Sequence, residues 1–426
     1  MLARIRSYPM VVLLLPLVAA ILLFDHFQPL QSLPKGTQKY GFIIESAPKF
    51  TAKCERFETH LLSGEKVLLY LLKDSTRALP FYGDTVVAKT EIEWFHSTGM
   101  AFAARYIILP TETHKVPLQV RLYKRLQSAG LEGDELATVG ALTLGYKEDL
   151  EPELKRHFRA SGAAHVLAVS GLHTGILYGI LYILLTLGGR FKPKYENHIG
   201  RCIISLVIIG VMWFYAWLTG MTPSVVRAVV MVTIFEIGRM LYRQAFSLNT
   251  IAAAAILILL VRPTDLWSIS FQLSFAATAA IVIIARKAES FLHRKNLKYT
   301  WYGRITSWVL GTIIISFAAQ IGTLPLTMHY FGQISNYFLL TNLIVLPLAT
   351  FLVPCGLISI ALGGSWLGVL FSKITFVLSW AMNHSVGWLE SLPGSTTKVT
   401  VGTGMVILYY MLFIAFCVSL YGIKRK

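Results

Sequence analysis

Residues 336–361 read NYFLLTNLIVLPLATFLVPCGLISIA, a run without a single charged side chain. An α-helix needs about 20 such residues to cross the hydrocarbon core of a bilayer, which is roughly 30 Å thick. The whole chain has the same character, because 55% of its 426 residues are hydrophobic and only 14% are charged. A soluble protein of this length needs more polar surface. The sequence therefore predicts a polytopic α-helical membrane protein.

Apolar segments of the same kind recur from residue 170 to the end of the chain. Besides the run quoted above, they lie near 170–189, 201–219, 224–242, 247–262, 265–286, 305–328, 366–390 and 400–421. Residues 1–30 add a basic start followed by an apolar stretch, which predicts an uncleaved N-terminal membrane anchor. Together these segments predict about 9–11 transmembrane or re-entrant helices.

Lys and Arg are concentrated in two connecting segments, 190–201 and 286–304. Cytoplasmic loops carry an excess of these bases, and the even number of spans between the two segments allows both to be cytoplasmic. Both chain termini then lie in the cytoplasm, and we expect a multi-pass protein of the cytoplasmic (inner) membrane. The net charge of +17 has partly this origin, and the remainder fits a polyanionic substrate such as nucleic acid.

Residues 38–115 differ from the apolar segments, because their acids nearly balance their bases. Stretches such as KYGFIIESAP and YGDTVVAKTEIEWF are typical of strands and are separated by SG, DS and GD turns. The spacing fits a small all-β domain, an OB-like barrel, which the topology places outside the cytoplasm. Its aromatic side chains either fill the barrel core or offer a stacking platform for bases. The candidates are Tyr70, Phe81, Tyr82 and Trp94.

Residues 118–160 are mostly helical and half polar, and they link the β domain to the membrane region. Within them, DLEPELKRHF predicts a helix that is capped by Asp149 and has Pro152 in its first turn. Its apolar stripe consists of Leu150, Leu154 and Phe158. Two explanations fit the stripe equally: an amphipathic helix at the membrane interface in contact with lipid, or a helix packed on the soluble part of the protein.

The stretch HVLAVSGLHTG, residues 165–175, places a serine and two histidines at the start of an apolar run. A serine hydrolase would need G-x-S-x-G, but residue 168 is Ala, residue 172 is Leu, and no acid flanks His173. His165 and His173 lack a third metal ligand nearby. The remaining interpretations are a broken helix beside a transport path and a satisfied turn. We therefore expect no catalytic residue, no metal and no cofactor.

The same stretch begins a helix with a glycine at every fourth position. Gly171, Gly175 and Gly179 predict a groove for close packing of a neighbouring helix. A break at Ser170 would leave amide groups unpaired, and a helix N-terminus of this kind favours an anion such as phosphate.

Polar side chains inside apolar segments are candidates for function, because each must meet a partner or a cavity. Arg227 lies one turn inside a span, where it either snorkels, pairs with another helix or contacts substrate. Gln272 and Ser274 lie on opposite faces of one segment, which indicates a helix inside the bundle. Thr312, Ser316 and Gln320 form a stripe that predicts a water-filled path, although interhelical hydrogen bonding is the more frequent explanation for any single member.

Five segments in one order resemble a known family. They are GALTLGYKEDL, HVLAVSGLHTG, WLTGMTPSVVRAVVM, RPTDLWSISFQLSFAATAAI and AAQIGTLPLTMHYFGQIS. Together they are similar to the competence domain of the ComEC/Rec2 family, the channel for DNA uptake in natural transformation. The resemblance covers residues 134–360 clearly, and it makes residues 163–421 a competence-type transmembrane channel domain.

The resemblance implies passage of single-stranded DNA across a lipid membrane. It also implies an extracytoplasmic DNA-receptor protein and a cytosolic DNA motor as partners, and the pore forms within one chain or in a homodimer. From the resemblance and the polar pattern together, the positions expected along or beside the path are His165, Ser170, Gly171, His173, Arg227, Gln272, Ser274, Thr312, Ser316 and Gln320.

The chain also departs from the family pattern. Many members carry a metallo-β-lactamase-like domain, whereas no HxHxDH motif occurs in this sequence. We therefore expect no nuclease activity of this chain. A second hypothesis is a transporter or flippase for another anionic substrate on the same scaffold.

Overall fold

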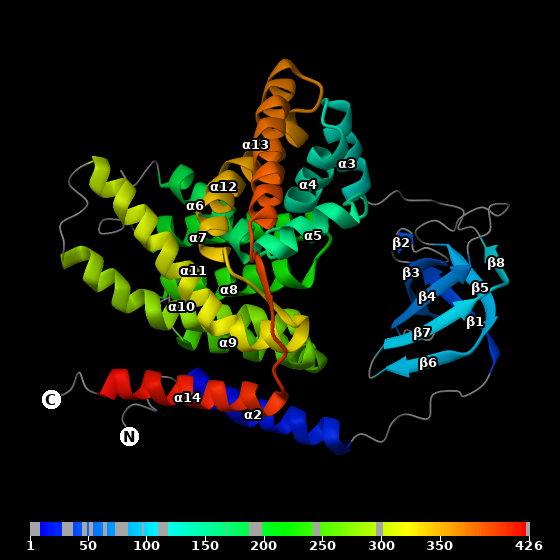
Figure 1. Cartoon of the computed structure of the whole chain (residues 1–426), viewed down its shortest axis with the longest axis horizontal. Coiled ribbons are helices and arrows are strands. Elements are labelled where there is room, and N and C mark those ends of the chain that lie inside the picture. The colour runs from blue at the N-terminus through cyan, green and yellow to red at the C-terminus, as the bar shows by residue number, and fades with distance from the viewer. Residues whose placement is uncertain are drawn as a thin grey trace. The chain divides into compact units, whose positions relative to one another are not determined.

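The computed structural model describes residues 9–27, 37–44, 49–50, 54–62, 66–72, 84–95, 98–109, 118–167, 169–186, 198–241, 248–294 and 301–422. The chain divides into two compact units. One comprises Met1–Leu23 and Leu122–Lys426, and the other comprises Phe24–Arg121. Figure 1 shows the first unit as a bundle of helices and the second as a twisted sheet.

The helical unit follows the apolar pattern of the sequence closely. Its helices are α2 (Pro9–Phe27), α3 (Leu118–Ser128), α4 (Gly133–Leu144), α5 (Pro152–Ser161), α6 (Gly171–Leu185), α7 (His198–Leu218), α8 (Pro223–Met240), α9 (Leu248–Val261), α10 (Ile269–Arg294), α11 (Trp301–Phe331), α12 (Phe338–Leu362), α13 (Trp366–Ser391) and α14 (Thr403–Gly422). The short 3-10 helix η3 (Pro263–Trp267) precedes α10, and the strands β9 (Gln333–Ser335) and β10 (Thr396–Lys398) pair with each other.

Four helices in the described part of the chain are long and apolar enough to cross a membrane: Ile199–Leu218, Ile305–Phe331, Phe338–Leu362 and Trp366–Ser391. Shorter apolar helices accompany them at Gly171–Leu185, Leu248–Val261, Ile269–Ile284 and Thr403–Phe413. The prediction of a polytopic helical membrane protein is thereby confirmed. The total number of spans stays a prediction.

The central core of the helical unit lies where α4 meets α12 and α13. Leu142, Val345 and Met382 are fully buried there. Gly356 of α12 brings that helix so close to α4 that a Cβ at this position would lie 2.8 Å from Cγ2 of Thr143. The core therefore holds α4 inside the bundle, although α4 belongs to the half-polar linking region.

Helix α5 starts later than expected and buries its apolar stripe. Its N-cap is Glu151 without a side-chain cap, and Pro152 is the first helical residue, so the prediction that Asp149 caps it is wrong. Proline is tolerated at this position because the first amide of a helix has no intrahelical partner. Leu154 and Phe158 pack into the core with α13. The stripe therefore packs on the protein, but against α13, which is a candidate membrane span, rather than on a soluble part.

The β unit contains one sheet of short strands. They are β1 (Gln38–Ile44), β2 (Lys49–Phe50), β3 (Cys54–Leu61), β4 (Lys66–Leu72), β5 (Thr85–Thr90), β6 (Ile92–Phe95), β7 (Thr98–Ala103) and β8 (Tyr106–Leu109). The strand order is β6-β7-β4-β3-β1-β5-β8, with β2 paired to β3. The pair β4 and β7 is parallel, and the other neighbours are antiparallel.

Side chains alternate between the two faces of this sheet. On β4, Val67, Leu69 and Leu71 are fully buried, and they form one core with Phe42 and Phe57. The small all-β unit that the sequence predicts is therefore confirmed.

Candidate functional site

The N-termini of α8 and α10 meet at one end of the helical unit. Pro223 begins α8 and η3 leads into α10, which begins at Ile269. The second residue of each helix is a serine, and the hydroxyl oxygens of Ser224 and Ser270 lie 3.3 Å apart. A helix N-terminus carries a partial positive charge. Two such ends therefore face the same small volume, and we call this place the Arg227 junction, formed by Ser224, Arg227 and Ser270.

Arg227 occupies the junction and is only 2% exposed. Its Nη2 donates to the hydroxyls of Ser224 at 3.2 Å and Ser270 at 2.5 Å. Its Nε and Nη1 are buried and have no hydrogen-bond partner. The side chain therefore does not snorkel to the surface. It pairs with another helix, as one of the three sequence alternatives proposed, but only through one of its nitrogen atoms.

A second polar contact lies two residues further along α10. Gln272 donates from Nε2 to the carbonyl of Leu266 at 3.0 Å and accepts from the hydroxyl of Tyr330 at 2.9 Å. Gln272 thus connects η3, α10 and the C-terminal end of α11. Together with the Arg227 junction, it makes this end of the bundle polar on three neighbouring helices.

The Ser–His pair of the SGLH motif caps α6. Ser170 is the N-cap, its Oγ accepts from the amide of Leu172 at 3.3 Å, and its own amide donates to Nδ1 of His173 at 3.0 Å. The expectation that the break leaves these amides unpaired is therefore wrong. Such a capping box contributes about 0.5–2 kcal/mol. His173 is fully buried, and its Nε2 has no hydrogen-bond partner.

The glycine positions of α6 do not form a tight groove among the described residues. A Cβ on Gly171 would meet Cβ of Ala228 at 3.9 Å, which is ordinary contact. A Cβ added to Gly175 or Gly179 would have no neighbouring atom within 4 Å. Within this part of the chain, only the first glycine approaches a neighbouring helix, α8, and it does so next to Arg227.

The remaining polar positions are distributed along the helices. Ser316 of α11 is 5% exposed, Thr312 and Gln320 are half-buried, and Ser274 of α10 is half-buried too. Several neighbouring hydroxyls bond within their own helix, as when Thr278 donates to the carbonyl of Ser274. His165 is exposed, and its Nδ1 lies 3.1 Å from the carbonyl oxygen of Gly162. A path that links these positions to Arg227 stays a prediction.

A fully buried carboxylate joins α6, α7 and α8. Glu236 accepts from Tyr178 at 2.7 Å, from Ser205 at 2.6 Å and from Arg239 at 3.0 Å. The guanidinium of Arg239 also lies over the ring of Tyr182, 4.8 Å from its centroid. The ion pair of Glu236 and Arg239 is not among the site residues predicted from the sequence. The spacing of three residues, one helical turn, is the signal that would have found it.

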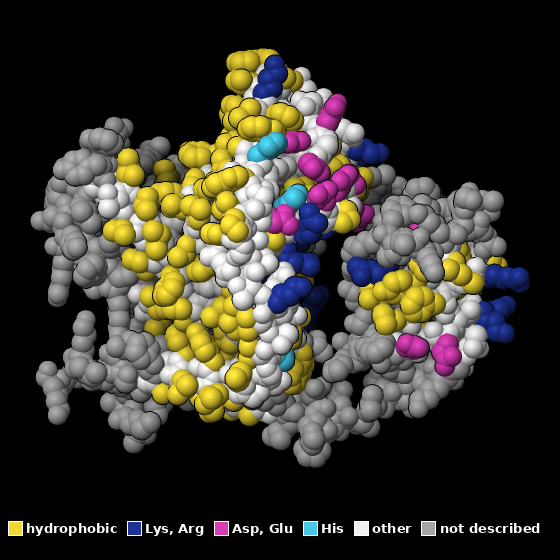
Figure 2. Space-filling model, viewed as in Figure 1, with side chains coloured by type: hydrophobic (Ala, Val, Ile, Leu, Met, Phe, Trp, Pro, Cys, Tyr) yellow, Lys and Arg dark blue, Asp and Glu magenta, His cyan; other side chains and the backbone are white. Residues whose placement is uncertain are grey.

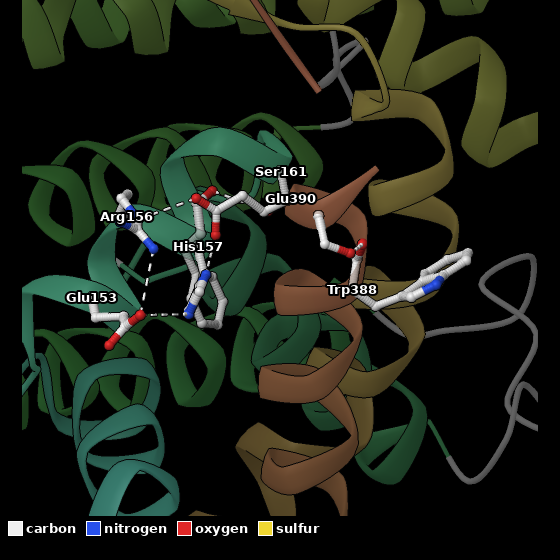
Figure 3. Close-up of polar contacts among 8 residues, drawn as sticks. Glu153, Arg156, His157, Ser161, Trp388 and Glu390 are labelled. Atoms are coloured by element: carbon white, nitrogen blue, oxygen red, sulfur yellow. Dashed lines mark hydrogen bonds and ion pairs between the residues drawn. The ribbon is translucent and has the colours of Figure 1, made fainter. Parts of the chain in front are cut away.

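Figure 3 shows a second ionic cluster, in which α5 and α13 meet. Glu390 of α13 bonds to Nδ1 of His157, and its other oxygen lies 3.2 Å from Nε of Arg156. Glu153 lies 3.4 Å from Arg156. Because the partners are 233 residues apart in the sequence, no local pattern predicts this contact. It fixes α5 on the bundle beside the buried Leu154 and Phe158.

In the β unit, Tyr70 lies on the outward face of β4. Its ring stacks on Phe102 of β7, with 4.7 Å between the ring centroids and 20° between the planes. Phe102 is 58% exposed, so the pair presents an aromatic surface outside the core of the β unit. Phe81 and Tyr82 lie outside the described residues, and Trp94 lies in β6 with a side chain that is not described.

The surface of the helical unit is mainly apolar in the view of Figure 2, with charged side chains gathered along one border. The exposed apolar side chains include Trp366, Val377 and Trp388 of α13. Exposed apolar belts of this kind mark surfaces that contact lipid or other protein. The buried cation of the Arg227 junction differs from this apolar surface, because two of its nitrogen atoms have no hydrogen-bond partner.

Comparison with known proteins gives a family match. The model of the family described as Competence protein matches residues 142–424. ComE operon protein 3 of Bacillus subtilis is 31% identical over 255 residues, which is 59% of this chain and 30% of that protein. Recombination protein 2 of Haemophilus influenzae is 24% identical over 296 residues, 67% of this chain and 37% of that protein. The chain thus spans about a third of the length of these two relatives. No solved structure matches it significantly.

Proposed function

Because the chain belongs to the competence-protein (ComEC/Rec2) family, we propose that it is a channel that carries single-stranded DNA across the cytoplasmic membrane during natural transformation. The observation that supports this proposal best is the extent of the family match. It begins within α4 and ends within two residues of the end of α14, so it includes the junction and the helices that build it. The proposed role involves no catalysis by this chain.

The charge of the connecting segments supports an orientation for the channel. The basic segments 190–201 and 286–304 belong in the cytoplasm by the positive-inside rule. They lie at the start of α7 and at the end of α10, whereas the Arg227 junction lies near the other end of these helices. The junction then lies at the extracytoplasmic mouth, where incoming DNA arrives. The sequence topology puts residues 38–115 outside the cytoplasm, and the stacked Tyr70 and Phe102 of the β unit would contact bases there.

The site chemistry fits a phosphate backbone in transit. Amide groups, hydroxyls and one cation attract phosphate, but a path lined by many fixed cations would hold a polyanion too tightly to release it. The polar side chains expected along the path on α10 and α11, which are Gln272, Ser274, Thr312, Ser316 and Gln320, are all uncharged. We propose a DNA-receptor protein outside and a DNA motor in the cytosol as partners that deliver and pull the strand.

Deletion of the gene tests this proposal. We expect transformation of the deletion strain to fall below detection and to return with the wild-type gene, and Arg227→Lys to restore more uptake than Arg227→Gln. The measurement is the frequency of transformants together with the uptake of labelled DNA into a nuclease-resistant form. Unchanged transformation with an altered envelope lipid composition would instead indicate the alternative, a flippase for another anionic substrate.

A further inference from the structure

The buried donors of Arg227 require a partner. A charged N–H group buried without a hydrogen bond costs more free energy than a neutral one, and native structures rarely keep such groups unless an ion or water satisfies them. Arg227 has two such atoms, Nε and Nη1. Their N–H groups point to different sides of the planar guanidinium, because Cδ lies beside Nη1, so each can donate to a separate acceptor oxygen.

The surroundings of Arg227 select an anion rather than water. The guanidinium touches the second residues of α8 and α10, so the positive ends of two long helices add to its charge. Ser224 and Ser270 offer hydroxyls to a further oxygen of the ligand. Ser270 is exposed, so the junction reaches the surface of the helical unit at this serine.

One acidic group competes for Arg227 within the chain. Asp265 of η3 interacts with the guanidinium through its charge, but no direct ion pair joins the two side chains among the described contacts. Asp265 is half-buried and lies in the segment that leads into α10. It can balance the charge of Arg227 before an anion binds, without occupying the two free donors.

We propose that Ser224, Arg227 and Ser270 form an anion-binding site that takes one phosphodiester group of a single-stranded nucleic acid, with Asp265 as a nearby negative charge that competes with the phosphate. This inference rests on the proposed function, because it names the group of the DNA that the mouth of the channel recognises. Arg227 donates from Nη1 to one phosphate oxygen, while Nη2 keeps its bonds to the two serines. Recognition is independent of base sequence, because the phosphate group is the same at every nucleotide.

The test is binding of a fluorescent oligo-dT to the purified full chain in nanodiscs, measured by anisotropy over a range of salt concentrations. Arg227→Gln should weaken binding about tenfold or more and reduce the salt-dependence slope by about 0.7, the value for one phosphate contact to a single strand. The affinity of Arg227→Lys should lie between that of the wild type and that of Arg227→Gln. An oligonucleotide with uncharged methylphosphonate linkages should not distinguish wild type from Arg227→Gln.

The matched control is Arg262→Gln, which removes an exposed arginine at the start of η3. An equal loss in both variants would show a diffuse charge effect and overturn the proposal, as would an unchanged slope in Arg227→Gln. If Arg227→Gln does not fold, the Asp265→Asn variant tests the site instead. Removal of the competing carboxylate should tighten oligo-dT binding. Unchanged or weaker binding would contradict the site. If the binding results hold while a deletion strain transforms normally, the site stands and the proposed function fails. If the deletion strain loses transformation but the binding results fail, the anion site is wrong and the proposed function stands.

Discussion

Replacing Glu236 by Ala is expected to lower the free energy of unfolding of the helical unit by about 3–5 kcal/mol, the cost of removing one partner of a buried ion pair. Glu236 is fully buried, and the side chain of Arg239 is only 16% exposed. Without the carboxylate, the guanidinium and the hydroxyls of Tyr178 and Ser205 lose their common acceptor. The measurement is denaturation of the purified protein in mild detergent.

Two further variants separate the ion pair from general damage. Glu153→Ala removes an exposed carboxylate with two ionic contacts on α5 and should cost at most about 1 kcal/mol. The double variant Glu236→Ala/Arg239→Ala should be more stable than the sum of the single losses predicts, because it leaves no unpaired charge. Additive losses would mean that the two residues act independently, contrary to the observed geometry.

The second large effect is expected at the contact between α10 and α11. A Cβ at Gly322 would lie 2.6 Å from the carbonyl oxygen of Ala276 and 2.7 Å from Cβ of Ala280. Gly322→Ala therefore forces the two helices apart, at a cost of about 1–3 kcal/mol or more, because the obstructing oxygen belongs to the backbone. Thermal denaturation of the same detergent-purified protein measures the loss.

Gly311 provides the matched control on the same helix. No atom lies within 4 Å of a Cβ at this position. Gly311→Ala should therefore be neutral or stabilising by up to about 1 kcal/mol, since alanine has the higher helix propensity. A stable Gly322→Ala protein, equal to the Gly311→Ala control, would show that α10 and α11 do not pack as closely as described.

The apolar pattern was sufficient to predict most of the helical architecture. The segments near 201–219 and 366–390 correspond to α7 and α13 within a few residues, because continuous hydrophobicity and length alone determine a membrane helix. The strands of the β unit were also predictable, since alternation and turn residues are local signals. The start of α5 was predicted wrongly because the helix begins at Pro152, which leaves the N-cap position to Glu151, although aspartate is the better capping residue.

The candidate site was predictable in its members but not in its contacts. Arg227 and Gln272 can be identified as candidates from the sequence alone, because polar groups in apolar segments are rare. Nothing in the sequence indicates that Arg227 reaches Ser270, since 43 residues separate them. The pairing of His157 with Glu390 was missed for the same reason. The Ser170–His173 cap joins residues close in the sequence, but it was not predicted. The third helical residue of a capping box is usually Glu or Gln, and here it is histidine.

The central claim is that this chain conducts single-stranded DNA, and reconstitution into liposomes tests it most directly. Liposomes that contain the purified chain and carry a membrane potential, positive inside, are mixed with a labelled oligonucleotide and then treated with nuclease. We predict a protected fraction well above that of empty liposomes, and a reduced fraction for Arg227→Gln. Protection equal to that of empty liposomes at every potential would contradict the account.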